Sequence, residues 1–161
     1  ARPHGRAGTR NVIAVISNVN CSAHATRQIA HYWTPERLAP FPNVDGVIAL
    51  THHSGCSMRL GGEEYVMLQR TLAGMARHPN VGACVIVGLG CETNQVSALM
   101  QDYGLDGPGL VIQELGGIRK TVEAGIELIV VVPEHIPVHD VMRMRAIAPI
   151  PSRNTPAAAR R

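Results

Sequence analysis

The sequence has few aromatic residues and little charge. Of its 161 residues, 3% are aromatic and 17% are charged, and the formal net charge at pH 7 is +3. Modules that bind nucleic acids usually combine a basic face with aromatic side chains on which bases stack. We therefore expect no nucleic-acid partner.

Long apolar runs and a signal peptide are also missing. The longest apolar runs, including 83–89 and 126–133, are about strand length, whereas a membrane-spanning helix needs about 20 residues. No apolar segment follows the basic residues at the N-terminus, as it would in a signal peptide. With 45% hydrophobic residues, the composition is that of a folded domain. These features predict a cytoplasmic protein without a membrane partner.

Cysteine is scarce and irregularly spaced, at positions 21, 56, 84 and 91. Four such residues do not make the disulfide framework of a small secreted domain. Cys84 lies inside an apolar run and is interpreted as an inert buried thiol. The other three cysteines are candidates for free thiols or metal ligands.

A pattern of strand, loop and helix repeats four times along the chain. Each unit begins with a short apolar run, typical of a strand buried on both faces. Apolar residues at three- and four-residue spacing then predict a helix. The predicted strands cover 12–16, 47–50, 83–87 and 110–112, and the predicted helices cover 23–33, 62–78, 96–103 and 119–126. This succession predicts an α/β fold with a Rossmann-like three-layer architecture, in which helices cover both faces of a parallel sheet of four or more strands.

The four loops after the predicted strands are rich in polar and thiol side chains. In open parallel sheets, ligands bind at the carboxyl ends of the strands, so these loops should converge on one site. The residues of interest in them are Asn20, Cys21, Ser22, His52, His53, Cys56, Cys91, Glu92, Asn94, Glu114, Gly116 and Gly117.

Seven ordered motifs connect the chain with a known family. They are Gly5-Arg-Ala-Gly-Thr-Arg-Asn11, Asn18-Val-Asn-Cys-Ser22, Pro42-Asn-Val-Asp-Gly46, Thr51-His-His-Ser-Gly-Cys56, Arg70-Thr-Leu-Ala-Gly74, Gly88-Leu-Gly-Cys-Glu92 and Gly116-Gly-Ile-Arg-Lys-Thr121. In this order and spacing they resemble the central part of the altronate/galactarate dehydratase family, from about Gly5 to about Gly125. The resemblance implies an iron- or manganese-dependent hydro-lyase that removes water from a sugar acid and gives a 2-keto-3-deoxy acid.

The chemistry of such a dehydration suits the residues of the loops. A base must remove the proton beside the substrate carboxylate, an acid must protonate the departing hydroxide, and a divalent metal can stabilise the developing charge. The predicted metal ligands are Cys21, His52, Cys56 and Cys91. Because thiolates are soft ligands, iron(II) is the expected metal, with manganese or zinc as alternatives.

His52 and Glu92 are the predicted catalytic residues. His52 directly follows the second strand and falls on the histidine of the family's Thr-His-x-x-Gly-Cys pattern, as base or as metal ligand. It could instead hydrogen-bond the loop or cap a helix, and Cys21 could likewise belong to a cap. Glu92 follows a glycine-rich turn, where a carboxylate at a helix start is also a common structural choice.

Further residues are predicted to bind the substrate. An arginine fork at Arg10 could hold a carboxylate, although this residue precedes the first strand. Gly116 and Gly117 would expose backbone N–H groups at a helix start, unless they form only a tight turn. The predicted substrate-binding residues are Arg10, Asn11, Asn20, Ser22, Asn94, Gly116, Gly117, Arg119 and Lys120.

Two other functions stay open. The segment from Gly88 to Thr93 partly resembles a dinucleotide-binding fingerprint, but threonine stands where the third glycine belongs. The acidic Glu114 also comes later than the fingerprint requires. A nucleotide-binding oxidoreductase is therefore the weaker alternative, and a non-catalytic ligand-binding module is the other.

The chain is predicted to hold one domain at 1–132, followed by a poorly ordered tail at 133–161. Residues after Gly125 no longer resemble the family, so 128–132 are expected to form a strand or an unsupported apolar patch. Family members carry one further domain before the matched region and one after it. This comparison predicts a truncated module with weak or no activity alone, lacking a companion domain or subunit. A homo-oligomer is also compatible with the sequence.

Overall fold

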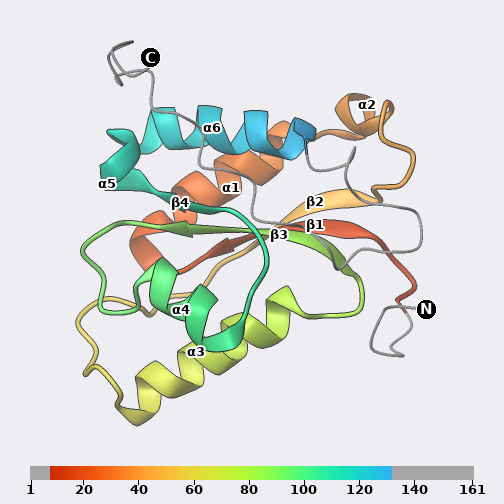
Figure 1. Cartoon of the computed structure of the whole chain (residues 1–161). Coiled ribbons are helices and arrows are strands. Elements are labelled where there is room, and N and C mark those ends of the chain that lie inside the picture. Colours follow the sequence, from red (N-terminus) through yellow and green to blue (C-terminus); the bar gives the residue numbers. More distant parts are fainter. Residues whose placement is uncertain (1–7, 132–161) are drawn as a thin grey trace, which may run out of the picture.

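The computed structural model describes residues 8–131, which form a parallel sheet between two layers of helices (Figure 1). The strand order is β2-β1-β3-β4. The strands are β1 (Val12–Ser17), β2 (Gly46–Leu50), β3 (Val81–Gly88) and β4 (Gly109–Val111). The helices are the 3-10 turn Asn20–Ser22, α1 (Ala23–Tyr32), α2 (Pro35–Leu38), α3 (Glu63–Ala76), α4 (Val96–Tyr103), α5 (Ile112–Leu115) and α6 (Ile118–Val131). The predicted three-layer α/β architecture is confirmed.

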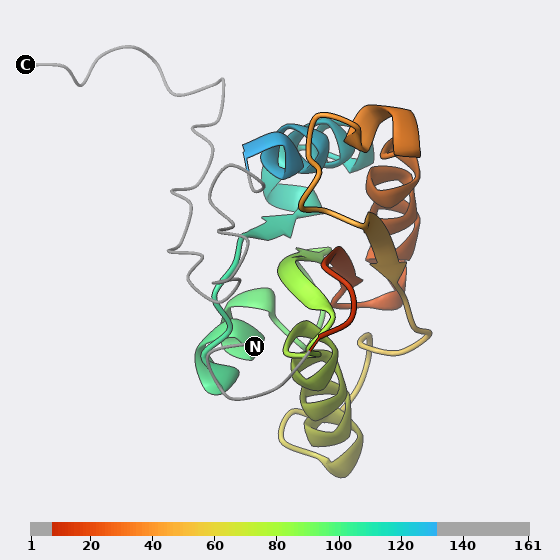
Figure 2. The same cartoon turned by 90° about the vertical axis from the view of Figure 1, so that its right-hand side faces the viewer.

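Strand β1 lies at the centre of the sheet and is buried on both faces. Its Ile13 pairs with Val47 of β2 and with Ala83 of β3, all in parallel. Successive side chains of a strand point to opposite faces. Ile13 and Val15 therefore pack under α1 and α6, whereas Ala14 and Ile16 pack against α3 and α4. Figure 2 shows these two helix layers on either side of the sheet.

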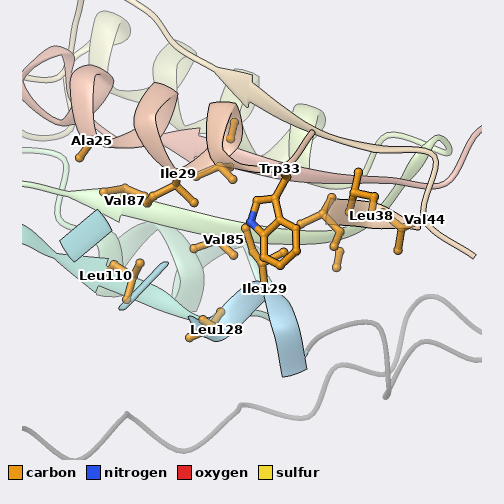
Figure 3. Packing of buried hydrophobic residues seen from close by; sticks show 14 of the residues in the cluster. Ala25, Ile29, Trp33, Leu38, Val44, Val85, Val87, Leu110, Leu128 and Ile129 are labelled. Atoms are coloured by element: carbon orange, nitrogen blue, oxygen red, sulfur yellow. The ribbon is translucent and has the colours of Figure 1, made fainter. Parts of the chain in front are cut away.

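The larger of the two apolar clusters lies between the sheet and the pair α1 and α6. Trp33, directly after α1, packs there close to Ile129 of α6 and Leu38 of α2 (Figure 3). Ile29 of α1 and Ile129 are both fully buried. This cluster extends across β1, β3 and β4, so it joins helices from the beginning and the end of the described chain.

Helix α6 corrects one prediction from the sequence. Residues 128–132 were expected to form a strand or an unsupported patch, but the helix continues to Val131. Its buried residues Thr121, Gly125, Leu128 and Ile129 recur at helical spacing. The β-branched run at the end of α6 obscured this period, and burial against α1 outweighs its β-propensity.

The remaining part of the domain prediction concerns residues 133–161. The tail expected there lies outside the described residues. Within residues 8–131, no helix is long and apolar enough to cross a membrane.

The strand order determines where the loops meet. The connection from β1 leads to β2 on one side, and the connection from β3 leads to β4 on the other. Such a reversal opens a crevice at the carboxyl ends of the two central strands, where ligands of open α/β sheets bind. The loops to α1, α3 and α4 begin at this edge, at the left of Figure 1, and α5 follows β4 there without a loop. The predicted convergence is confirmed for the first three loops, whereas most of the fourth predicted loop, 113–117, belongs to α5.

The contact between α6 and α1 generates a prediction about stability. A Cβ atom at Gly125 would lie 2.5 Å from Cδ1 and 2.9 Å from Cγ1 of Ile29, which is fully buried. We expect Gly125→Ala to cost about 1–3 kcal/mol through overpacking, more than the gain of about 1 kcal/mol in helix propensity. Urea unfolding followed by circular dichroism measures the difference.

Gly74 in α3 provides the matched control. It is exposed, and a Cβ atom there would have no neighbour within 4 Å. Gly74→Ala should therefore raise the free energy of unfolding by about 1 kcal/mol. Equal stabilisation by both substitutions would contradict the close helix contact at Gly125.

Candidate functional site

The carboxyl ends of β1 and β3 are joined by hydrogen bonds to one carbonyl group. The backbone N–H of Asn18 donates to the Val87 oxygen at 2.8 Å. The hydroxyl oxygen of Ser22 lies 2.6 Å from the same oxygen and 2.8 Å from the Val19 oxygen, so it donates to one of them. Ser22 is fully buried and joins the two strand ends. Its side chain is therefore not exposed for the substrate binding that the sequence predicted.

A buried polar group fills the crevice between the two loops that follow β1 and β3. Asn18 donates its side-chain N–H to Glu92 Oε1 at 3.3 Å and to the backbone oxygen of Asn94. In return, Asn94 Nδ2 donates to Asn18 Oδ1 at 2.8 Å. All three side chains are at least 98% buried. Within residues 8–131, Asn94 Oδ1 is the atom of this group that has no hydrogen-bond donor.

Glu92 also closes the loop in which it lies. Its Oε1 accepts from the backbone N–H of Leu89 at 3.0 Å, and its Oε2 accepts from that of Gly90 at 2.5 Å. In dinucleotide-binding folds, backbone N–H groups of the equivalent loop bind phosphate. Because a protein carboxylate already occupies these donors, the geometry argues against the nucleotide-binding alternative.

His52 links the loop after β2 to the end of β1. The backbone N–H of Ser54 donates to His52 Nδ1 at 3.1 Å, so the ring proton is on Nε2 and donates to the Ser17 oxygen at 2.9 Å. Burial lowers the pKa of His52, against a smaller opposing effect of the Ser17 carbonyl. Both ring nitrogens are hydrogen-bonded to the backbone. In this structure His52 therefore bonds the loop, which was the structural alternative to a catalytic role.

Gly55 brings the same loop against the backbone after β1. Its φ is +103°, and a Cβ atom would lie 2.8 Å from both the Asn18 oxygen and Val19 Cα. The Asn20 N–H donates to the Ser54 oxygen at 2.8 Å close by. Only glycine fits this approach without strain. The loops after β1 and β2 are thus held in direct contact.

The residues of the site separate into two groups by burial. We call the first group the inner framework, and its side chains are buried or half-buried and bonded to the loops. The second group, the exposed rim, faces solvent around it. The inner framework is Asn18, Ser22, His52, Glu92 and Asn94, and the exposed rim is Asn20, Cys21, Cys56, Cys91, Gly116, Arg119 and Lys120.

The cysteines follow the same division. Cys21, Cys56 and Cys91 are exposed free thiols on three different loops. Cys84 is 95% buried in β3, and burial raises its pKa to about 11. The prediction that Cys84 is an inert core thiol agrees with this environment, since only the thiolate is reactive.

The predicted metal ligands are not assembled into one group. Within residues 8–131, no three side chains of His, Cys, Asp or Glu form a cluster that could hold a metal ion. His52 is also directed to Ser17 and Ser54 rather than to the exposed thiols. These four residues by themselves do not fit a metal site, and the bound metal stays a prediction.

Arg10 and Asn11 lie at the opposite edge of the sheet. The N–H groups of Thr9 and Arg10 donate to Asn80 Oδ1, and that of Asn11 donates to Asp45 Oδ2. Strand β1 then separates them from the loops by about 20 Å, at about 3.3 Å per residue. They bind the ends of β2 and β3 instead of a ligand at the carboxyl edge.

The segment Gly116–Gly117 forms a tight turn, and its N–H groups are not exposed as predicted, because the Gly116 N–H donates to the Gln113 oxygen at 3.2 Å. Gly116, at φ +81°, ends α5, and the Gly117 N–H donates to the Ile112 oxygen at 2.9 Å, which makes a tight turn. Helix α6 begins directly afterwards, and the first N–H groups of a helix have no intrahelical partner. Lys120 reaches back over Gly116, whereas Arg119 forms an exposed ion pair with Glu123 at 3.5 Å.

Asn18 is the site residue that reasoning from the sequence missed. It lies inside the quoted motif, but asparagine is common in loops and nothing local distinguishes it. Its partners are 74 and 76 positions away in the sequence. The order of the loops around a parallel sheet could have pointed to this pairing only after the strand order was known.

The buried group generates a second prediction. Asn18→Leu keeps the size of the side chain but leaves buried partners on Glu92 and Asn94 without hydrogen bonds. We expect a loss of about 2–4 kcal/mol in the free energy of unfolding. The exposed Asn20 is the control, and Asn20→Leu should change stability by less than about 0.5 kcal/mol. Similar urea midpoints for the two variants would contradict the role of Asn18.

The environment of His52 generates a prediction about pH. Folding lowers the pKa of this ring below the value of about 6.5 that it has in the unfolded chain. The stabilisation is therefore complete above about pH 6.5 and is lost as pH falls below it. His52→Gln should reduce the decrease of the urea midpoint between about pH 7.5 and 5.5. An unchanged decrease of the urea midpoint in His52→Gln would contradict the lowered pKa of this ring.

Comparisons with known proteins confirm the resemblance seen in the motifs. The chain is 34% identical to altronate dehydratase of Escherichia coli (strain K12) over 127 residues, which are 78% of this chain and 25% of that protein. It is 30% identical to altronate dehydratase of Bacillus subtilis (strain 168) over 133 residues, 80% of this chain and 25% of that protein. The chain thus spans about a quarter of these relatives' length. No solved structure matches it significantly.

A family model extends the match further than the motifs did. The model described as D-galactarate dehydratase/Altronate hydrolase, second domain, matches residues 1–136. The expectation that the resemblance stops near Gly125 is therefore wrong, and all of α6 belongs to the matched region. The chain belongs to the D-galactarate dehydratase/altronate hydrolase family, within which it corresponds to the second domain.

Proposed function

We propose that this chain forms one wall of the active site of a sugar-acid hydro-lyase, acting on a substrate of the altronate or galactarate type. The observation that carries the proposal is the convergence of three loops and the α5–α6 turn, all with family motifs, at one sheet edge. The two relatives are altronate dehydratases, which supplies the reaction class. Removal of water from a 2,3-dihydroxy acid would give a 2-keto-3-deoxy acid.

The exposed rim is the part that would meet the substrate. The N-terminus of α6, a helix of 14 residues, offers backbone N–H groups and a positive dipole end to a carboxylate. Lys120, the single lysine of the chain, lies at the same place and adds a full positive charge. We assign the binding of a substrate carboxylate to this position, with Asn20 across the crevice available to a hydroxyl group.

His52 and Glu92 act in this proposal as positioning residues. The hydrogen bonds of both side chains are directed into the loops, and Glu92 is 98% buried. A direct acid or base role would require each of them to release its backbone partners. The proton transfers are therefore assigned to groups that complete the site from beyond residues 8–131.

Iron(II) remains the proposed metal, with manganese or zinc as alternatives. The rim thiols Cys21, Cys56 and Cys91 are accessible donors, and thiolates favour iron or zinc over harder metals. Because they form no three-ligand group here, further ligands would come from a companion domain or subunit. Alone, the chain is then expected to have weak or no dehydratase activity.

A chimaeric enzyme tests the proposal. Residues 1–136 of this chain replace the matched quarter of the Escherichia coli altronate dehydratase, and the formation of 2-keto acid from altronate and from galactarate is followed with semicarbazide. We expect turnover and stoichiometric iron in the chimaera after anaerobic loading, and neither in the isolated chain. Lys120→Ala should raise KM by about tenfold, the effect of losing about 1.4 kcal/mol of binding.

Two results would contradict the proposal. One is a chimaera that folds but forms no 2-keto acid, and the other is efficient turnover by the isolated chain. Arg37→Ala is the control for Lys120, because Arg37 is an exposed cation on α2, outside the exposed rim, and donates to the Tyr32 oxygen at 2.6 Å. An unchanged KM in Lys120→Ala would contradict the binding of the substrate carboxylate at the α6 N-terminus. It would not contradict the reaction class.

A further inference from the structure

A groove lies outside the carboxyl edge, between α1 and the edge strand β2. Seven of its lining residues come from α1 and the two positions after it, and two come from β2. None of them was predicted as a site residue from the sequence. The lining residues are His24, Arg27, Gln28, Ala30, His31, Trp33, Thr34, Val47 and Ala49.

Strand β2 leaves one edge of the sheet open. It pairs with β1 alone, and the part of the chain that the structure describes places no strand on its other side. An edge strand presents unpaired N–H and C=O groups to any extended segment that approaches it. Val47 and Ala49 supply an apolar floor beside it, and Ile48 on the opposite face is 37% exposed. The groove thus combines apolar surface with a free backbone edge.

The outer wall of the groove carries one arginine and two histidines. His24, Arg27 and His31 lie three and four positions apart, so they share one face of α1 over about 10 Å. The Arg27 guanidinium donates to the Thr51 hydroxyl at 3.3 Å. The ion pair between Arg119 and Glu123 lies far from Arg27 in the sequence. Within residues 8–131, no acidic side chain lines the groove.

Two carboxylates stand two positions from lining residues in the sequence. Glu36 of α2 is hydrogen-bonded to the side chain of Thr34, which lowers the pKa of Glu36. Asp45, directly before β2, accepts from the backbone N–H of Asn11 through Oδ2 at 2.5 Å. Arg27 is the lining residue that carries a full charge at pH 7.

We propose that the groove binds an extended polypeptide segment that carries carboxylates. The segment pairs with β2 as a fifth strand and directs acidic side chains to Arg27 and its two histidine neighbours. Addition of a strand to an open sheet edge derives affinity from backbone hydrogen bonds and specificity from side-chain pockets. This inference does not depend on the dehydratase proposal.

Charge favours an acidic partner over the two other occupants of such an edge. A second copy pairing antiparallel through β2 would place its own α1 on the same side of the joined sheet, so the two Arg27 side chains would repel each other. The chain's own C-terminal segment 132–161 carries five arginines against Glu134 and Asp140. Like charges opposed across an interface cost binding energy, so both occupants are disfavoured.

Trp33 allows a direct test, because it is the only tryptophan of the chain and borders the groove. The probe is a blocked heptapeptide of alternating glutamate and valine, titrated into the whole chain while tryptophan emission is recorded. We expect saturable binding, with none for the matching peptide of lysine and valine. Hydrogen exchange of the backbone amides in β2 should slow when the acidic peptide is bound.

Two variants and a modified peptide sharpen the result. Arg27→Ala should weaken binding of the acidic peptide at least about fivefold, as expected for a lost charge-assisted hydrogen bond. Arg70→Ala is the matched control, because Arg70 is equally exposed but lies on α3. N-methylation of alternate peptide bonds in the probe should abolish binding, since it removes the donors that pair with β2.

Several outcomes would overturn the proposal. Equal binding of the lysine peptide would exclude charge recognition, and unimpaired binding of the N-methylated peptide would exclude strand pairing. Displacement of the peptide by an equal concentration of succinate would identify a site for small anions instead. Dimerisation of the chain alone, reversed by the peptide, would assign the edge to a second copy.

Discussion

The hydrogen bonds between the ends of β1 and β3 hold the functional edge of this protein together. The Val87 carbonyl accepts the Asn18 backbone N–H, and the Asn18 side chain then bonds to Glu92 and Asn94 on the next loop. A buried polar group without a partner costs far more than the net gain of one hydrogen bond. Replacing any one of these buried side chains would leave its partners without hydrogen bonds. The loops therefore tolerate little variation in residue type at these positions.

This constraint separates two kinds of residue that motifs in a sequence cannot distinguish. A motif marks positions where residue type matters, whether for holding a loop or for contacting a ligand. Here His52, Glu92 and Asn94 hold the loops, while the thiols of Cys21 and Cys91 and the amine of Lys120 face outward. A rigid inner layer that supports an outer reactive layer is what a precise active site requires.

The surface of the domain carries two distinct features for association. The carboxyl edge offers the exposed rim, whose thiols do not make a complete metal site among the described residues. The open edge at β2 offers backbone groups beside a helix face that carries Arg27 and two histidines. Relatives four times as long would have ample chain to cover either surface, because this chain spans 25% of their length.

The sequence by itself determined the architecture, the convergence of the loops and the family. Apolar runs of strand length alternate with helical spacing, and these local patterns are sufficient to predict a parallel sheet. It failed at α6, where a β-branched end hid a helix. It also did not place Arg10, whose backbone N–H bonds to Asn80 at the edge opposite the loops. Only the tertiary structure decided which polar residues are buried. The pairing of Asn18 with Glu92 joins positions 74 apart, and burial depends on neighbours that chain spacing does not reveal.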